Sequence, residues 1–303
     1  MRSSNANIRP CKILLRRFVA GCLIVSSWVG ALIAADRPKS EARVLFLGNS
    51  VFNYRGGVCQ SFEGFCREAG LKWDAVSQWT EPENVHGIEF LNYGRIPLSL
   101  PEVAGDERIH SLIRKGNFDY VVLEARRPGY LVPEWVGRPE ALKLGEHIPY
   151  ERNLASLKSL HRTIAGSGAQ TILYQHPGHH RLEGWKLPVA RIYERFQKDL
   201  EGVEIGGRTH SVLLVPASFL WLDARKRFDL EEWYSDSNHG TALARYASAC
   251  LLFTYITKRD PRSVSYRELP RSWTASSGSK TSLAPREAAD WIKHRAWFYF
   301  TSE

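Results

Sequence analysis

Two short stretches of the chain carry residue types that can together activate a hydroxyl group. Ser50 ends the sequence Gly48-Asn49-Ser50, and Asp236 stands three residues before His239. A serine hydroxyl becomes a good nucleophile when an imidazole accepts its proton, and a carboxylate fixes the tautomer of that imidazole. If the fold brings Ser50, Asp236 and His239 together, they can carry out acyl transfer. In isolation each has a structural alternative, with Ser50 as a turn or helix-cap serine and Asp236 as a helix N-cap.

Both stretches stand at the boundaries of predicted elements. Residues 43–47 (RVLFL) predict a strand that ends at Gly48, and residues 57–69 carry apolar side chains at helical spacing. Residues 240–257 predict a helix that begins directly after His239. A serine between a strand and a helix exposes its hydroxyl and directs backbone N–H groups toward a developing oxyanion. The predicted elements therefore suit a nucleophile at residue 50.

The rest of the chain repeats this alternation of strands and helices. Further strands are predicted over residues 71–77, 118–123, 171–174 and 211–215, and further helices over 106–115, 154–164 and 188–200. Such alternation is typical of βαβ units. We therefore predict a three-layer α/β/α sandwich with a mainly parallel central sheet, whose reactive groups lie at the carboxyl ends of the strands.

The two chemical stretches resemble the conserved blocks of a known family. Gly48-Asn49-Ser50 after the first strand and Asp236-x-x-His239 before the last helix resemble the SGNH hydrolases, also called the GDSL-like esterase/lipase superfamily. The resemblance spans residues 43–258. It implies an SGNH/flavodoxin-like fold and an esterase that works through a Ser50, His239 and Asp236 triad. It also implies chemistry without a metal ion or another cofactor.

The resemblance also implies an oxyanion hole, in which this chain departs from the family. Ser50 supplies one N–H, and Gly94 in Leu91-Asn92-Tyr93-Gly94 is the best match for the second donor. The family's third donor is an asparagine, whereas this chain reads Glu124-Ala125-Arg126-Arg127. We expect Arg126 to replace it, because a guanidinium carries five N–H donors. Alternatively, Gly94 is a turn glycine and the arginines are solvated loop cations. Three residues are expected to contact substrate: Asn49, Arg127 and His176.

Histidines and cysteines offer little support for metal binding or cross-linking. His176, His179 and His180 follow a predicted strand, but no carboxylate stands at ligand spacing, so we expect no metal site. Cys59 and Cys66 are seven residues apart in a predicted helix, about 10 Å between Cα atoms and too far for a disulfide. Together with Cys250 they are expected to be buried free thiols.

The first 35 residues have the layout of a secretory signal peptide. Residues 1–17 are basic without an acid, residues 18–34 are apolar, and Ala34-Ala35 follows as a small-residue cleavage site. We therefore predict an exported protein with a signal peptide (1–35), an SGNH-hydrolase-like domain (36–260) and a C-terminal extension (261–303) that packs on it. An uncleaved N-terminal anchor is the alternative, because the apolar run approaches the length of a spanning helix.

Composition excludes several classes of partner. The 303 residues have a net charge of +9, of which the leader contributes +5 from five basic residues and no acid, so the rest carries +4 with both signs interspersed. Without a basic run or recognition motif, no nucleic-acid partner is expected, nor any membrane contact after leader removal. The oligomeric state stays open.

Three functional hypotheses follow. The leading one is an exported esterase acting on a small or carbohydrate ester, because Tyr130, Trp135, Tyr150 and Trp185 stand near predicted loops. The second is a non-catalytic binding protein on the same scaffold with an impaired oxyanion hole. The third is a flavodoxin-like binding fold in which Ser50 and His239 lie far apart.

Overall fold

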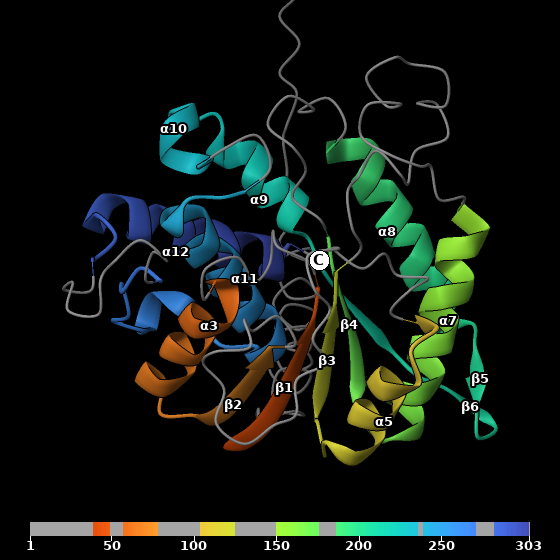
Figure 1. Ribbon diagram of the computed structural model, residues 1–303. Coiled ribbons are helices and arrows are strands. Elements are labelled where there is room, and N and C mark those ends of the chain that lie inside the picture. The colour runs from red at the N-terminus through yellow and green to blue at the C-terminus, as the bar shows by residue number, and fades with distance from the viewer. Residues whose placement is uncertain are drawn as a thin grey trace, which may run out of the picture. The chain divides into compact units, whose positions relative to one another are not determined.

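Five parallel strands form the central sheet of the protein (Figure 1). The computed structural model describes residues 39–48, 57–77, 104–124, 150–175, 186–235, 239–270 and 282–302. The strands are ordered β2-β1-β3-β4-β7, and all four neighbouring pairs are parallel. Their bounds are β1 Glu41–Leu47, β2 Lys72–Ser77, β3 Tyr120–Leu123, β4 Gln170–Tyr174 and β7 Val212–Val215. The mainly parallel sheet expected from the sequence is confirmed.

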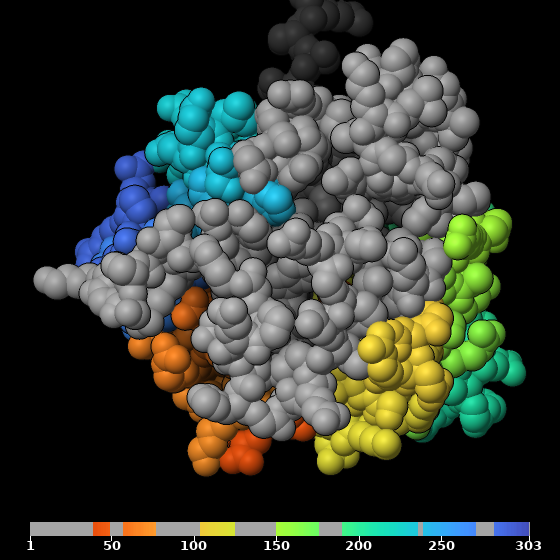
Figure 2. Space-filling model, in the orientation of Figure 1, coloured from red at the N-terminus to blue at the C-terminus, as the bar shows by residue number. Residues whose placement is uncertain are grey.

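Helices cover both faces of this sheet. One layer contains α3 (Gly57–Glu68), α9 (Ala217–Ala224), α10 (Leu230–Trp233), α11 (Ala242–Thr257) and α12 (Arg286–Thr301). The other contains α5 (Glu107–Lys115), α7 (Tyr150–Gly166) and α8 (Lys186–Glu201). In the space-filling view, α3 and α12 lie on the left of the visible face and α5 and α7 on the right (Figure 2). The three-layer α/β/α architecture is therefore as predicted.

The alternation of side chains along each strand explains the two layers. Phe46 and Val122 point into the core that α3 and α11 cover, whereas Leu47 and Leu123 point into the core that α5, α7 and α8 cover. All four side chains are at most 3% exposed. Strands buried on both faces have nearly continuous apolar sequences, as parallel strands generally do.

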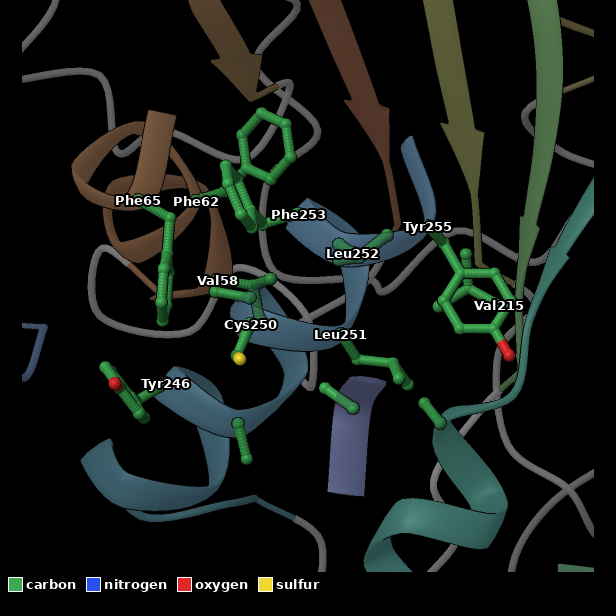
Figure 3. Packing of buried hydrophobic residues seen from close by; sticks show 14 of the residues in the cluster. Val58, Phe62, Phe65, Val215, Tyr246, Cys250, Leu251, Leu252, Phe253 and Tyr255 are labelled. Atoms are coloured by element: carbon green, nitrogen blue, oxygen red, sulfur yellow. The ribbon is translucent and has the colours of Figure 1, made fainter. Parts of the chain in front are cut away.

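The larger core lies between α3 and α11 (Figure 3). Phe65 of α3 packs against Tyr246, Phe253 and Tyr266, with ring centroids 5.1, 5.5 and 4.9 Å away. The three cysteines expected to be buried thiols are confirmed as buried and outside any disulfide: Cys59, Cys66 and Cys250. Burial raises the pKa of the Cys66 and Cys250 thiols well above its ordinary value.

The C-terminal helix shares this core. Ala289, Ile292 and Ala296 of α12 have no exposed surface and belong to the same cluster as the buried side chains of α11. Lys293 is also buried, and its Nζ donates to the carbonyl of Val264 just after the 3₁₀ turn η5 (Pro261–Ser263). Among the helices that the structure describes, none is both long and apolar enough to cross a bilayer.

Three short features were absent from the sequence prediction. They are α9, α10 and the antiparallel hairpin of β5 (Glu204–Ile205) with β6 (Arg208–Thr209). The sequence of α9, ASFLWLDA, is apolar on nearly every side, so it has no helical periodicity to detect. The other elements are only two to four residues long, which is too short for a periodic pattern.

Candidate active site

The carboxyl ends of the strands meet at one edge of the sheet. The strand order, numbered along the sheet as 2-1-3-4-5, is that of a doubly wound fold whose switch point lies between the first and third strands. Ligands of such folds bind outside the carboxyl ends of the strands at that point. Gly48 follows β1 and Glu124 follows β3, and the Glu124 N–H donates to the Leu47 carbonyl at 3.0 Å. Gly48 and Glu124 therefore flank the expected binding position.

Glu124 is a buried carboxylate at this switch point. It is 4% exposed and lies near Tyr174, the last residue of β4. Burial raises the pKa of Tyr174 strongly, and the negative charge of Glu124 raises it further, against the hydrogen bond with Ser248 that lowers it. Sequence reasoning treated Glu124 only as part of the segment that lacks an asparagine. The missed signal was an acid directly after an apolar strand.

Gln175 is a second buried polar residue at the same edge. It follows β4, and its N–H donates to the Val215 carbonyl at 3.0 Å, which extends the pairing with β7 by one residue. Its side chain has no exposed surface, and among the described residues neither Oε1 nor Nε2 has a hydrogen-bond partner. Gln175 was not among the residues singled out from the sequence, although it directly follows a predicted buried strand.

His239 is held by a closed loop before α11. The carbonyl of His239 accepts hydrogen bonds from Ser235 N at 2.8 Å and from Ser235 Oγ at 3.1 Å. Tyr234 and Gly240 form an antiparallel bridge across the base of this loop. The imidazole-bearing residue is half-buried. Both ends of the segment that carries Asp236 and His239 are therefore fixed by main-chain bonds.

The N-cap residue of α11 strengthens this loop. Thr241 is the N-cap of α11, and its Oγ1 accepts from Ala244 N at 3.4 Å. The same hydroxyl donates to the Glu232 carbonyl at 2.6 Å, and the Thr241 N–H donates to the Trp233 carbonyl at 3.0 Å. One threonine thus joins the start of α11 to the end of α10, with His239 two residues before it.

Trp221 of α9 connects this loop to the sheet. A Cβ added to Gly240 would lie 2.6 Å from Cη2 of Trp221, so the indole touches the main chain next to His239. The indole Nε1–H donates to Ser248 Oγ at 3.1 Å, and the Tyr174 hydroxyl donates to the same oxygen at 2.7 Å. Since Tyr174 ends β4, these contacts link the His239 loop to the carboxyl edge of the sheet.

Most of the other site residues expected from the sequence lie outside the described residues: Asn49, Ser50, Gly94, Arg126, Arg127, His176 and Asp236. Their convergence on His239 stays a prediction. Of the groups that the structure does describe, no three His, Cys, Asp or Glu side chains lie close enough together to hold a metal ion. The described part of the edge consists of Gly48, Glu124, Gln175 and the His239 loop.

No protein-family model matches the sequence, and no curated protein matches it either. The solved structures that are similar to the chain include two hydrolases. An α/β hydrolase from the metagenome of Lake Arreo in Spain is 13% identical with a TM-score of 0.48, covering 72% of this chain and 95% of that one. A catalytic mutant of an acetylxylan esterase from Geobacillus stearothermophilus is 12% identical with a TM-score of 0.44, covering 71% and 94%. At this level the similarities carry no conclusion about activity.

Proposed function

We propose that the protein is a serine esterase of the SGNH type, with Ser50 as nucleophile, His239 as general base and Asp236 as the residue that orients it. One observation supports this most directly. The closed His239 loop packs on Trp221, whose indole is linked through Ser248 to Tyr174 at the carboxyl end of β4, and β1 ends just before Gly48 on the same edge of the parallel sheet. Chain connectivity keeps Ser50, two residues further, within about 7 Å of Gly48.

The proposed reaction has two halves. His239 accepts the Ser50 proton as Ser50 Oγ attacks the ester carbonyl, and it then donates this proton to the departing alcohol as the carbon–oxygen bond breaks. Water next attacks the acyl-enzyme with His239 again as base, which releases the acid and restores Ser50. The oxyanion receives N–H donors from Ser50, Gly94 and Arg126, each required about 2.7–3.1 Å from the developing charge.

The test is hydrolysis of 4-nitrophenyl acetate together with covalent labelling by a fluorophosphonate. The parent should hydrolyse the ester and gain one label on the Ser50 peptide. Ser50→Ala and His239→Asn should each lower kcat/KM at least about 10³-fold, and Arg126→Ala at least about tenfold. His210→Asn is the matched control, because His210 precedes β7 at the opposite edge of the sheet and should retain parental activity. A parent that neither hydrolyses nor labels would favour the binding-protein hypothesis.

Export and substrate class belong to the same proposal. The leader layout supports removal of residues 1–35 during export, and N-terminal sequencing of exported protein that begins at Met1 would contradict it. Tyr130, Trp135 and Trp185, which stand near predicted loops, support a carbohydrate ester as substrate, with Asn49, Arg127 and His176 in contact with it. Tyr150 does not add to this support, because it begins α7 and stacks on Phe196 of α8. Comparing acetylated xylan with 4-nitrophenyl acetate tests that choice.

A further inference from the structure

Trp221 contacts both flanks of the His239 loop. Its ring lies 5.2 Å from that of Tyr234 at an interplanar angle of 69°, so it packs edge-on against the chain that enters the loop. On the other flank it lies against Gly240, where a Cβ would be 2.6 Å from Cη2. Tyr234 and Gly240 are the two residues whose bridge closes the loop. The indole therefore supports the base of the loop from one side.

The indole is itself fixed on three elements. It is 2% exposed, it donates to Ser248 of α11, and Ser248 accepts from Tyr174 of β4. Trp233 packs edge-on against the indole at 5.7 Å and 80°. We call Trp221, Ser248 and Tyr174 the indole support. Because Tyr174 is the last residue of β4, the indole support links the His239 loop to the carboxyl edge of the sheet.

We propose that Trp221 is a positioning residue that sets the distance between the His239 imidazole and the carboxyl edge where Ser50 follows β1. This inference rests on the proposed function. Gly240 has no side chain, so the indole meets main chain directly, and a shift of the ring moves the backbone next to His239. Displacing a catalytic group by about 1 Å can cost about 10²-fold in rate.

The first test is Trp221→Phe, which shortens the ring beside Gly240 and removes the Nε1–H donor. We expect kcat for 4-nitrophenyl acetate to fall about tenfold to a hundredfold, with KM within about twofold of the parent. The acid midpoint of the kcat/KM profile, which reports ionisation of the free enzyme, should also move. Exhaustive fluorophosphonate labelling counts the competent sites, so kcat is expressed per labelled site and unfolded protein does not contribute.

Trp73→Phe is the matched control. Trp73 is also a buried indole, 6% exposed and stacked on Tyr120 at 5.4 Å, but it pairs with Ala42 near the amino end of β1. The same chemical change there should lower thermal stability while kcat per labelled site and the pH profile stay parental. A purely structural role for Trp221 predicts that Trp221→Phe behaves like this control.

A double variant tests the contact itself. As a single variant, Gly240→Ala should lower kcat, because its Cβ would lie 2.6 Å from Cη2 of Trp221 and 2.9 Å from Cβ of Ala244, and only the first of these clashes depends on the indole. Phenylalanine has no atom equivalent to Cη2, so the loss in Trp221→Phe/Gly240→Ala should be smaller than the product of the two single losses, and additive losses would argue against direct contact. Ser248→Ala, which removes the acceptor of the indole N–H, should lower kcat less than Trp221→Phe.

The two proposals fail in distinguishable ways. If the parent is active and His239→Asn is not, but Trp221→Phe keeps the parental kcat and pH profile, the positioning role is wrong and the esterase assignment stands. If the parent lacks activity or His239→Asn retains it, the esterase assignment itself is wrong. Reduced kcat per labelled site in Trp221→Phe alone, with the control unchanged, supports the inference.

Discussion

At the scale of single residues, the buried polar groups after β3 and β4 distinguish this edge of the sheet from an ordinary core. Glu124 is 4% exposed and Gln175 is fully buried. A buried polar group that lacks a hydrogen-bond partner costs about 1–3 kcal/mol. Among the described residues the Gln175 amide has no such partner. The fold therefore retains a side chain there that weakens it.

Replacing Gln175 by methionine, which has a similar shape, should raise the free energy of unfolding by about 1–3 kcal/mol, because it removes the amide and keeps the packing. Chemical denaturation with urea measures this change. The control is Gln170→Met, at the first residue of β4. The Gln170 Nε2 has a hydrogen bond to Ser211 Oγ at 3.4 Å and is not buried, so the change there should be within about 0.5 kcal/mol. A destabilised Gln175→Met protein would mean that the amide has partners in solution, such as water.

At the scale of elements, side chains from the flanking helices form hydrogen bonds with main-chain groups of both edge strands. On β2, Ala75 N donates to Glu63 of α3 at 3.1 Å. On β7, Val212 N donates to Glu201 of α8 at 3.2 Å, and the Val212 carbonyl accepts from Gln197 at 2.8 Å. Burial raises the pKa of Glu63. These contacts cover groups through which an open edge could pair with another chain.

The start of α11 depends on one hydroxyl. Thr241→Ala removes both the N-cap acceptor and the donor to Glu232, and we expect the free energy of unfolding to fall by about 1–2 kcal/mol. Thr241→Ser keeps the hydroxyl and should lose less than half of that. Thermal denaturation of both variants measures the difference. Equal losses would show that the methyl group, not the hydroxyl, matters at this position.

At the scale of the whole molecule, a buried histidine makes the fold sensitive to acid. His161 of α7 has no exposed surface, and its Nδ1 lies 2.8 Å from Thr171 Oγ1 in β4. Burial, together with the nearby charges of His210 and Arg162, lowers the pKa of His161 to about 4. The folded protein therefore holds this imidazole neutral in a range where the unfolded chain binds a proton.

The free energy of unfolding should fall at acid pH, because the unfolded chain binds a proton at His161 more readily than the folded protein does. Above the ordinary histidine pKa, His161 is unprotonated in both the folded and the unfolded chain, so it does not lower the free energy of unfolding. As the pH falls from about 6.5 to about 4, only the unfolded chain gains the proton, so up to about 3 kcal/mol of stability is lost. Urea unfolding at several pH values measures this effect in the parent and in His161→Leu. As the pH falls, the free energy of unfolding of the parent should decrease relative to that of His161→Leu by up to that amount.

Leu160→Val is the control for this comparison, because Leu160 is fully buried on the same helix and has no titratable group. Its destabilisation relative to the parent should be independent of pH. If the difference between the parent and His161→Leu is also constant from pH 7 to pH 4, His161 does not carry the acid sensitivity.

The sequence by itself determined the five strands of the central sheet and the longer helices that flank it. Strand periodicity, helix periodicity and their alternation are local patterns, and they placed the strand that ends at Gly48 and the helix after His239. The state of the three cysteines also followed from spacing, because seven residues of helix separate Cys59 and Cys66 too widely for a disulfide.

Only the tertiary structure decided how the His239 loop is supported. Trp221 reaches Gly240 across α10, and Tyr174 reaches Ser248 across 74 residues. Such contacts leave no periodic trace, because each depends on how two separate elements pack rather than on the spacing of residues within one.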